Sequence, residues 1–232
     1  MCNSDQVSQL HPLRIWGTFP ICGGSGASTT AFYIALAAKN LGVKSILIEG
    51  DALSRRNNQF QDQERNWKSY QNLEMKIPAN AFPEPLSSGV TYLSFTEMSE
   101  NSSKSVSHLI DGAAEEFELI IIDLPRHFSE FTNSLTSKIT MLNLIGVSGI
   151  ESVRSLNRLR KSSLNVETSN LLLRTTRNSN LSSKESSYQM GFNTFIKLPE
   201  SESVQDLETY GVLPPSKDAL MKILQNFVSI NL

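Results

Sequence analysis

The chain has few cysteines and no long apolar run, and each of these two features excludes a class of protein. Its 232 residues include two cysteines, Cys2 and Cys22, which are too few for a disulfide framework or a zinc site. No apolar run approaches the roughly 20 residues that span a bilayer. Residues 1–12 are polar and lack the apolar core of a signal peptide. We therefore expect a soluble, cytoplasmic protein whose residues 1–12 form a flexible N-terminus.

An excess of charge of one sign is also absent. The chain carries 21 lysines and arginines against 23 aspartates and glutamates. This balance gives no general attraction to nucleic acid or to a membrane. We therefore expect no nucleic-acid partner, and contact with membranes only through other proteins. Four basic residues along one expected helix could contact DNA phosphates, although a solvated helix face is the simpler interpretation: Arg154, Arg158, Arg160 and Lys161.

Apolar runs of strand length alternate with helical patterns along the chain. We expect strands at residues 13–19, 44–48, 90–95, 119–122, 141–147, 171–173 and 194–198. We expect helices at residues 31–41, 103–116, 151–159, 182–190, 203–209 and 216–227. This alternation predicts an α/β fold, a doubly wound, mostly parallel sheet of about seven strands with helices on both faces. A single domain over residues 13–232 would carry a long polar insertion at about 54–88.

A glycine-rich turn follows the first expected strand and reads Ile21-Cys22-Gly23-Gly24-Ser25-Gly26-Ala27-Ser28-Thr29-Thr30. A strand, such a turn and a helix N-terminus form an anion site, because backbone N–H groups and the helix dipole converge there. The usual phosphate-binding pattern is G-x-x-x-x-G-K-[ST]. Here Ala27 stands in place of the lysine, and Ser28 takes the Mg²⁺-ligand position. The turn therefore suits binding of a nucleotide better than its cleavage. Alternatively, the turn only lets the helix pack closely on the sheet.

Two further strands are followed by an aspartate. Asp51 comes after the strand at 44–48, and Asp123 comes directly after the strand at 119–122. The carboxyl ends of parallel strands meet at one edge of the sheet, where ligands bind. An aspartate at such a strand end beside a phosphate loop orients Mg²⁺, directly or through water. Singly, each aspartate is more simply a helix cap or a turn residue. Together with the glycine-rich turn, they predict a nucleotide and metal site.

These segments resemble the deviant Walker motifs of the MinD/ParA superfamily. Residues 22–30 resemble its Walker A, commonly K-G-G-x-G-K-T-T, and the G-A-S-T form looks like the CpaE/TadZ-like branch. Residues 48–53 and 117–126 are similar to that branch's V-D-A-D-P-L and to its Walker B. Trp67 and several later segments resemble actinobacterial members described as septum-site-determining or secretion-neighbourhood proteins: 86–94, 171–174, 198–199 and 210–214. The resemblance spans about residues 13–225.

The resemblance implies a homodimer that sandwiches ATP and Mg²⁺ between its protomers. The residues that would bind the nucleotide are Gly23, Gly24, Ser25, Gly26, Ala27, Ser28 and Thr29. Ser28, Asp51 and Asp123 would hold Mg²⁺, and Asp51 would also be catalytic by orienting water. The resemblance further implies a spatial organiser or assembly factor for a secretion/pilus-like apparatus or for septum placement. Its partners would recruit it to a pole, a septum or a membrane complex.

The chain departs from this family mainly in its cations. Cys22 stands in place of the signature lysine that reaches across the dimer, and Ala27 replaces the second lysine. Glu49 replaces the first acid of a D-x-D pair, and residues 174–176 occupy the region of an adenine-reading asparagine. Three functions stay open. They are a weakly or non-hydrolysing switch, a nucleotide-free scaffold that binds partner proteins, and an active ATPase whose missing positive charge comes from Arg55, Arg56 or Arg126.

Overall fold

The computed structural model describes residues 13–50, 81–94, 102–126, 133, 135–161, 166, 168–176 and 179–232. Its strands are β1 (Arg14–Pro20), β2 (Ser45–Glu49), β3 (Thr91–Leu93), β4 (Leu119–Asp123), β5 (Met141–Val147), β6 (Asn170–Arg174) and β7 (Ile196–Leu198). Its helices are α1 (Ala27–Asn40), α2 (Ser102–Glu116), α4 (Ile150–Leu159), α5 (Ser183–Gln189), α6 (Glu202–Tyr210) and α7 (Ala219–Asn231). The α/β alternation predicted from the sequence is confirmed. The first helix begins four residues earlier than its apolar spacing indicates, because its first turn belongs to the glycine-rich loop.

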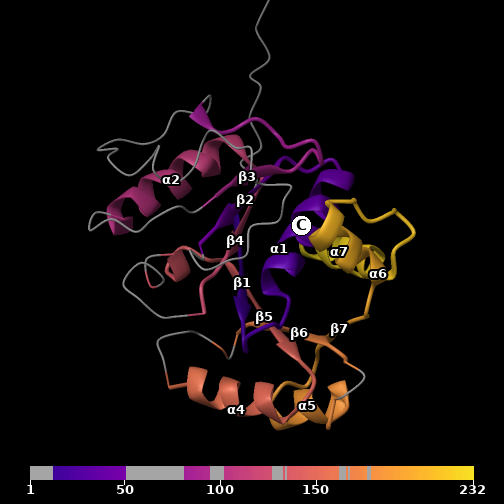
Figure 1. Cartoon of the computed structure of the whole chain (residues 1–232). Helices are drawn as coiled ribbons and strands as arrows, with labels where there is room; N and C mark the ends of the chain where they lie inside the picture. Colours follow the sequence, from indigo (N-terminus) through magenta and orange to yellow (C-terminus); the bar gives the residue numbers. More distant parts are fainter. Residues whose placement is uncertain are drawn as a thin grey trace, which may run out of the picture.

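Within the described part of the chain, the strands form one parallel sheet of seven strands in the order β3-β2-β4-β1-β5-β6-β7 (Figure 1). β1 lies in the middle and pairs with β4 on one side and β5 on the other. The strand order therefore reverses at β1. Ligands of doubly wound sheets bind at such a switch point, beyond the carboxyl ends of the strands. The loop after β1 lies at that point.

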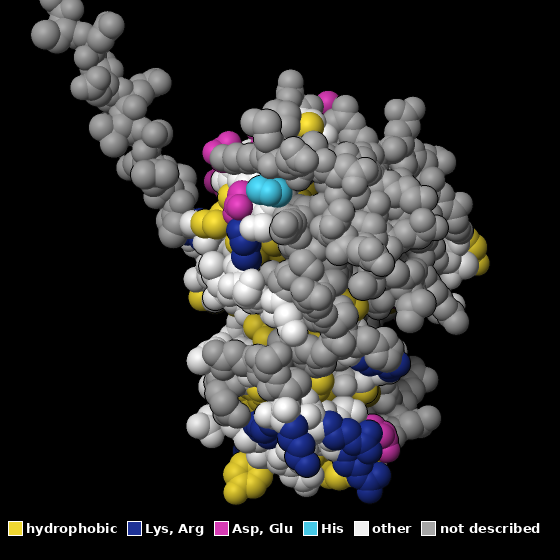
Figure 2. All heavy atoms as spheres, turned by 90° about the vertical axis from the view of Figure 1, so that its left-hand side faces the viewer, with side chains coloured by type: hydrophobic (Ala, Val, Ile, Leu, Met, Phe, Trp, Pro, Cys, Tyr) yellow, Lys and Arg dark blue, Asp and Glu magenta, His cyan; other side chains and the backbone are white. Residues whose placement is uncertain are grey.

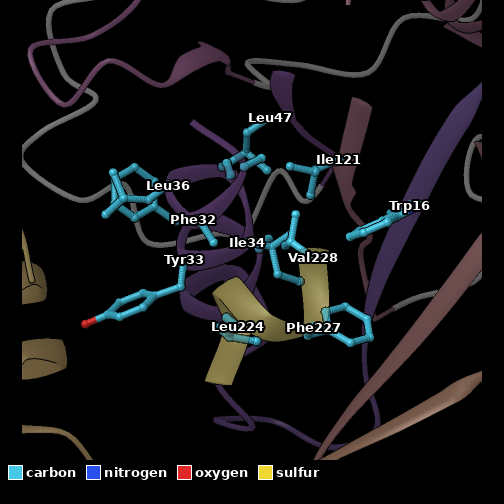
Figure 3. Close-up of a cluster of buried hydrophobic side chains, with 14 of the residues drawn as sticks. Trp16, Phe32, Tyr33, Ile34, Leu36, Leu47, Ile121, Leu224, Phe227 and Val228 are labelled. Atoms are coloured by element: carbon cyan, nitrogen blue, oxygen red, sulfur yellow. The ribbon is translucent and has the colours of Figure 1, made fainter. Parts of the chain in front are cut away.

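One face of the sheet is covered by α1 and α7. Trp16, Leu47 and Ile121 point toward these helices, and the Trp16 ring lies 5.6 Å from the ring of Phe227, centroid to centroid (Figure 3). Ten of the fourteen residues of α1 are buried, because the sheet covers one side of the helix and α7 another. A helix enclosed in this way is apolar on most of its surface. α1 is thus held firmly with its N-terminus at the switch point.

The other face of the sheet carries a second core. Alternate strand residues such as Ile15, Ile46 and Ile120 belong to this core, together with side chains from α2 and α4 and with Met190, which follows α5. The end of the expected insertion joins this core, since the ring of Phe82 meets Phe117 edge-on at 5.3 Å. The insertion's first part, residues 54–80, lies outside the described residues. Within the described segments, no helix combines the length and apolar character needed to cross a bilayer.

Candidate nucleotide-binding site

The loop between β1 and α1 is shaped by two glycines with left-handed backbones. Gly24 has φ +68° and Gly26 has φ +83°. Glycine adopts such angles without the steric cost that a Cβ brings. The Ser25 N–H donates to the Cys22 carbonyl oxygen at 3.3 Å, and both the N–H and the Oγ1–H of Thr30 donate to the carbonyl oxygen of Gly26 at 2.8 Å. These bonds fold the chain tightly around the start of α1.

The backbone N–H groups at the N-terminus of α1 are available to a ligand. The N–H groups of Gly26, Ala27 and Ser28 take part in none of the backbone–backbone hydrogen bonds found among the described residues. Gly26, the N-cap, places no side chain over them, and the first turn holds no acidic residue. Unpaired N–H groups and the positive end of the helix dipole attract an anion. The predicted phosphate-binding loop is therefore open to a ligand.

A cavity of about 580 Å³ adjoins this loop. Ser25, Thr29 and Arg174 line it together with the connection from β7 to α6, residues 198–202. Ser25 is 2% exposed, yet among the described residues its Oγ has no hydrogen-bond partner, and the buried Nε of Arg174 has none there either. Buried polar atoms are normally hydrogen-bonded. Two unpaired polar atoms on residues that line one cavity therefore fit a polar ligand of nucleoside size.

Two arginines reach the loop from different strands. Nη2 of Arg174, at the end of β6, donates to the Gly24 carbonyl oxygen at 2.8 Å. Nη1 of Arg126, after β4, lies 2.6 Å from the position that a Cβ on Gly23 would take. Of the arginines proposed from the sequence, Arg126 is thus brought to the loop, while Arg55 and Arg56 lie outside the described residues. Sequence reasoning missed Arg174, although its position at a strand end was the signal that could have found it.

Two acidic residues meet at the ends of β2 and β4. Asp123 is 4% exposed and accepts a hydrogen bond from Thr18 Oγ1 at 3.4 Å. It is paired in register with Glu49 of β2, which is also buried. The Gly50 N–H then donates to the Asp123 carbonyl oxygen at 2.8 Å and so holds the end of β2 beside β4. Asp51 itself lies outside the described residues, so its role stays a prediction.

A second cavity, of about 620 Å³, lies where Cys22 and Gly23 meet α4. Arg126 and Arg158 line it together with Glu151. The Cys22 sulfur, at the signature-lysine position, lies 3.4 Å from Ser152 Oγ. Figure 2 shows lysine and arginine side chains gathered at the lower end of the molecule, where Figure 1 places α4. Two arginines therefore line this cavity against one glutamate.

The first cavity, of about 580 Å³, has more acidic than basic side chains among its described lining residues. Glu200 and Glu202 line it, and Glu208 of α6 accepts a hydrogen bond from Thr29 Oγ1 at 2.7 Å. Burial, and after it the nearby carboxylates of Asp218 and Glu208, raise the pKa of Tyr33 above its usual range. Among the described residues that line this cavity, Arg174 supplies the positive charge. A phosphate group would therefore depend on Arg174 and the loop amides.

The family follows from a sequence comparison. The family model described as "ATPase MipZ" matches residues 21–144, more than half of the chain. The chain belongs to the MipZ family. The matched range contains the loop and both strand-end aspartates, whereas Arg174 lies beyond it. This family is of the ParA/MinD type, so the superfamily predicted from the motifs is confirmed, and the CpaE/TadZ-like branch stays a prediction. No curated protein shows significant similarity to the chain.

Solved structures of the ParA/MinD type share the fold of this MipZ-family chain. A ParA family ATPase from Chlorobium tepidum is 15% identical, with a TM-score of 0.73 over 94% of this chain and 98% of that one. MinD in a MinC:MinD cell division protein complex from Aquifex aeolicus is 14% identical, with a TM-score of 0.73 over 94% and 95%. A plasmid partition protein from Borrelia burgdorferi bound to AMPPNP is 16% identical, with a TM-score of 0.64 over 94% and 97%. At these identities the likeness shows the fold.

Proposed function

We propose that this protein is a nucleotide-binding spatial organiser of the ParA/MinD type, which forms a nucleotide-biased homodimer and hydrolyses ATP weakly or not at all. The proposal includes the CpaE/TadZ-like branch and a role in a secretion/pilus-like apparatus or in septum placement. One observation carries it. The N-terminal amides of α1 and the buried Ser25 hydroxyl have no partner among the described residues, and Ser25 lines a cavity large enough for a nucleoside.

The bound group would be ATP with Mg²⁺. MinD from Pyrococcus horikoshii was solved in complex with Mg-ADP and shares the fold at a TM-score of 0.70, 13% identity. In this chain, the amides of residues 24–29 would hold the phosphates. Ser28 and Asp123, with Asp51, would hold Mg²⁺, which when bound neutralises part of the phosphate charge. The hydroxyl of Thr18 orients the Asp123 carboxylate for that task.

Weak hydrolysis follows from the residues at the two lysine positions. Ala27 ends in a methyl group and offers the phosphates no charge. Cys22 contacts Ser152 of α4 and carries no ammonium group. Removing one preorganised donor to a developing negative charge slows a reaction by about 100- to 1000-fold. Binding loses less, because the backbone amides remain.

Nucleotide binding is the first prediction. Titration with ATP·Mg²⁺ should give saturable heat at one site per protomer, and ADP·Mg²⁺ should bind at the same site. Adenosine should bind more weakly, because the loop amides contact the phosphates. Light scattering should show more dimer with ATP·Mg²⁺ than with ADP·Mg²⁺. Absence of heat with every nucleotide would refute the proposal and favour a nucleotide-free scaffold.

Hydrolysis is the second prediction. Phosphate release by the wild-type chain should be slow, and a variant carrying both Cys22→Lys and Ala27→Lys should raise it by about 100-fold or more, because two donors return to the phosphates. A specific observation favours the rival, an active ATPase, since Arg126 and Arg174 already bring positive charge to the loop. Fast phosphate release by the wild type that disappears in Asp51→Ala would establish that rival.

A further inference from the structure

We propose that Arg174, at the end of β6, replaces the missing lysine of the phosphate loop and contacts the phosphates of the bound nucleotide. This inference rests on the nucleotide binding proposed above and names the residue on which it depends. It extends beyond the matched family region, which ends at residue 144. It also differs from the expectation that Arg55, Arg56 or Arg126 supplies the missing positive charge.

The sheet holds Arg174 firmly beside the loop. β6 pairs with β5, where Arg174 is in register with Val147, and the Arg174 carbonyl oxygen accepts a hydrogen bond from the Ser148 N–H at 2.8 Å. β5 in turn pairs with β1, and the Ile21 N–H at the loop entrance donates to the Ile145 carbonyl oxygen at 2.8 Å. Both the arginine and the loop are thus fixed to β5. Little conformational entropy is lost when they bind a ligand together.

The guanidinium of Arg174 has donors left for a ligand. A guanidinium carries five N–H donors, and Nη2 uses one of them on the Gly24 carbonyl oxygen. Nε is buried and has no partner in the part of the chain that the structure describes. Nη1 lies 3.6 Å from the position that a Cβ on Gly26 would take. Since Gly26 has no side chain, nothing on that residue separates the guanidinium from the amides at the start of α1. An arginine in this place can bind a phosphate through two parallel hydrogen bonds.

The charges around the cavity make this cation necessary. Glu200 and Glu202 line the cavity, and Glu208 is bonded to Thr29 of the first helical turn. Without Arg174, no basic side chain among the described residues that line this cavity would offset its carboxylates for a bound triphosphate. Arg126 lies at Gly23 and lines the other cavity, with Cys22. The two arginines therefore act on different sides of the loop, and Arg174 is the one on the side of the unpaired Ser25 hydroxyl.

The test compares ATP·Mg²⁺ with adenosine by calorimetry in matched variants. Arg174→Ala should weaken ATP binding by roughly 10- to 100-fold, the usual effect of losing a charged hydrogen bond. Adenosine affinity should change by less than about threefold, since adenosine has no phosphate. Arg154→Ala is the control, because Arg154 is exposed on α4 and lies 3.7 Å from Glu151. It should bind both ligands as the wild type does.

A rescue variant gives the second measurement. Ala27→Lys places an ammonium group at the usual lysine position, so adding it to Arg174→Ala should recover about tenfold or more of the lost ATP affinity. If Arg174→Ala does not fold by circular dichroism, Arg174→Gln, which keeps length and loses charge, takes its place with the same expectation. Recovery with Ala27→Lys supports a charge that acts on phosphate.

The experiments distinguish failure of the Arg174 inference from failure of the proposed function. Wild-type affinity for ATP in Arg174→Ala or Arg174→Gln would overturn this inference and leave the proposed function standing. Equal losses for ATP and adenosine would also overturn it, since Arg174 would then shape the cavity and not bind phosphate. Absence of nucleotide binding by the wild type would refute the proposed function, and this inference with it.

Discussion

Phe227→Ala is expected to lower the free energy of unfolding by about 3–5 kcal/mol, as a large buried aromatic ring is lost and a cavity remains. Phe227 lies on α7, is 5% exposed and packs against Trp16 of the central strand β1 (Figure 3). It belongs to the core that holds α7 against α1 and the sheet. For a chain of this length the loss corresponds to a fall in Tm of roughly 6–20 °C.

The matched control lies three residues further along the same helix. Ile230 is 72% exposed, so Ile230→Ala should change the free energy of unfolding by no more than about 0.5 kcal/mol. Urea denaturation followed by circular dichroism measures both variants. Equal losses in the two would mean that α7 does not pack on the sheet through Phe227. A near-zero effect of Phe227→Ala would contradict the arrangement of this core.

Gly26→Ala should abolish most nucleotide binding, with a loss of ATP affinity on the order of 100-fold or more, since each hydrogen bond to a charged group contributes about 1.5–3 kcal/mol. Gly26 has φ +83°, an angle that costs an alanine about 1–2 kcal/mol. Relief of that strain would turn the amides of Ala27 and Ser28 away from the phosphates. A methyl group that stayed in place would lie 3.6 Å from Nη1 of Arg174. Calorimetry with ATP·Mg²⁺ measures the loss.

Gly42→Ala separates backbone strain from the loss of the binding loop. Gly42 has φ +79° after the C-terminal end of α1, and a Cβ there would meet no atom of the described residues within 4 Å. Its substitution should cost a similar amount of stability, about 1–2 kcal/mol, and leave ATP affinity unchanged. If both variants lose affinity equally, the loop has no special part in binding. If Gly26→Ala binds ATP as the wild type does, the phosphates lie elsewhere.

Much of the fold could be predicted because its determinants are local. The run from Leu119 to Ile122 is continuously apolar, as a parallel strand covered on both faces must be, and it forms β4. Met141–Val147 forms β5 with the bounds that its apolar pattern predicts. Gly24 and Gly26 mark the turn after β1 because other residues rarely adopt their backbone angles. Asp123 ends β4 beside Thr18 of β1, since parallel strands end at one edge.

The site's charges could be predicted only in part. The missing lysines at positions 22 and 27 are visible in the sequence, and Arg126 was named because it comes three residues after the end of β4. Arg174 was not, because its position at a strand end is visible in the sequence but the neighbours of that strand are not. The bond from Thr29 to Glu208 escaped prediction for the same reason, as it joins α1 to a helix 179 residues away. Such contacts follow from packing between elements and leave no local pattern.

By itself, the sequence determined the alternation of strands and helices, the glycine loop and the carboxylates at the strand ends, all of which depend on short-range backbone preferences and burial patterns. Tertiary structure alone decided the strand order β3-β2-β4-β1-β5-β6-β7. That order brings the Arg174 guanidinium to Gly24 across 150 residues of chain. Hydrogen bonding and side-chain packing between distant strands select the neighbours, and so decide which cation reaches the loop.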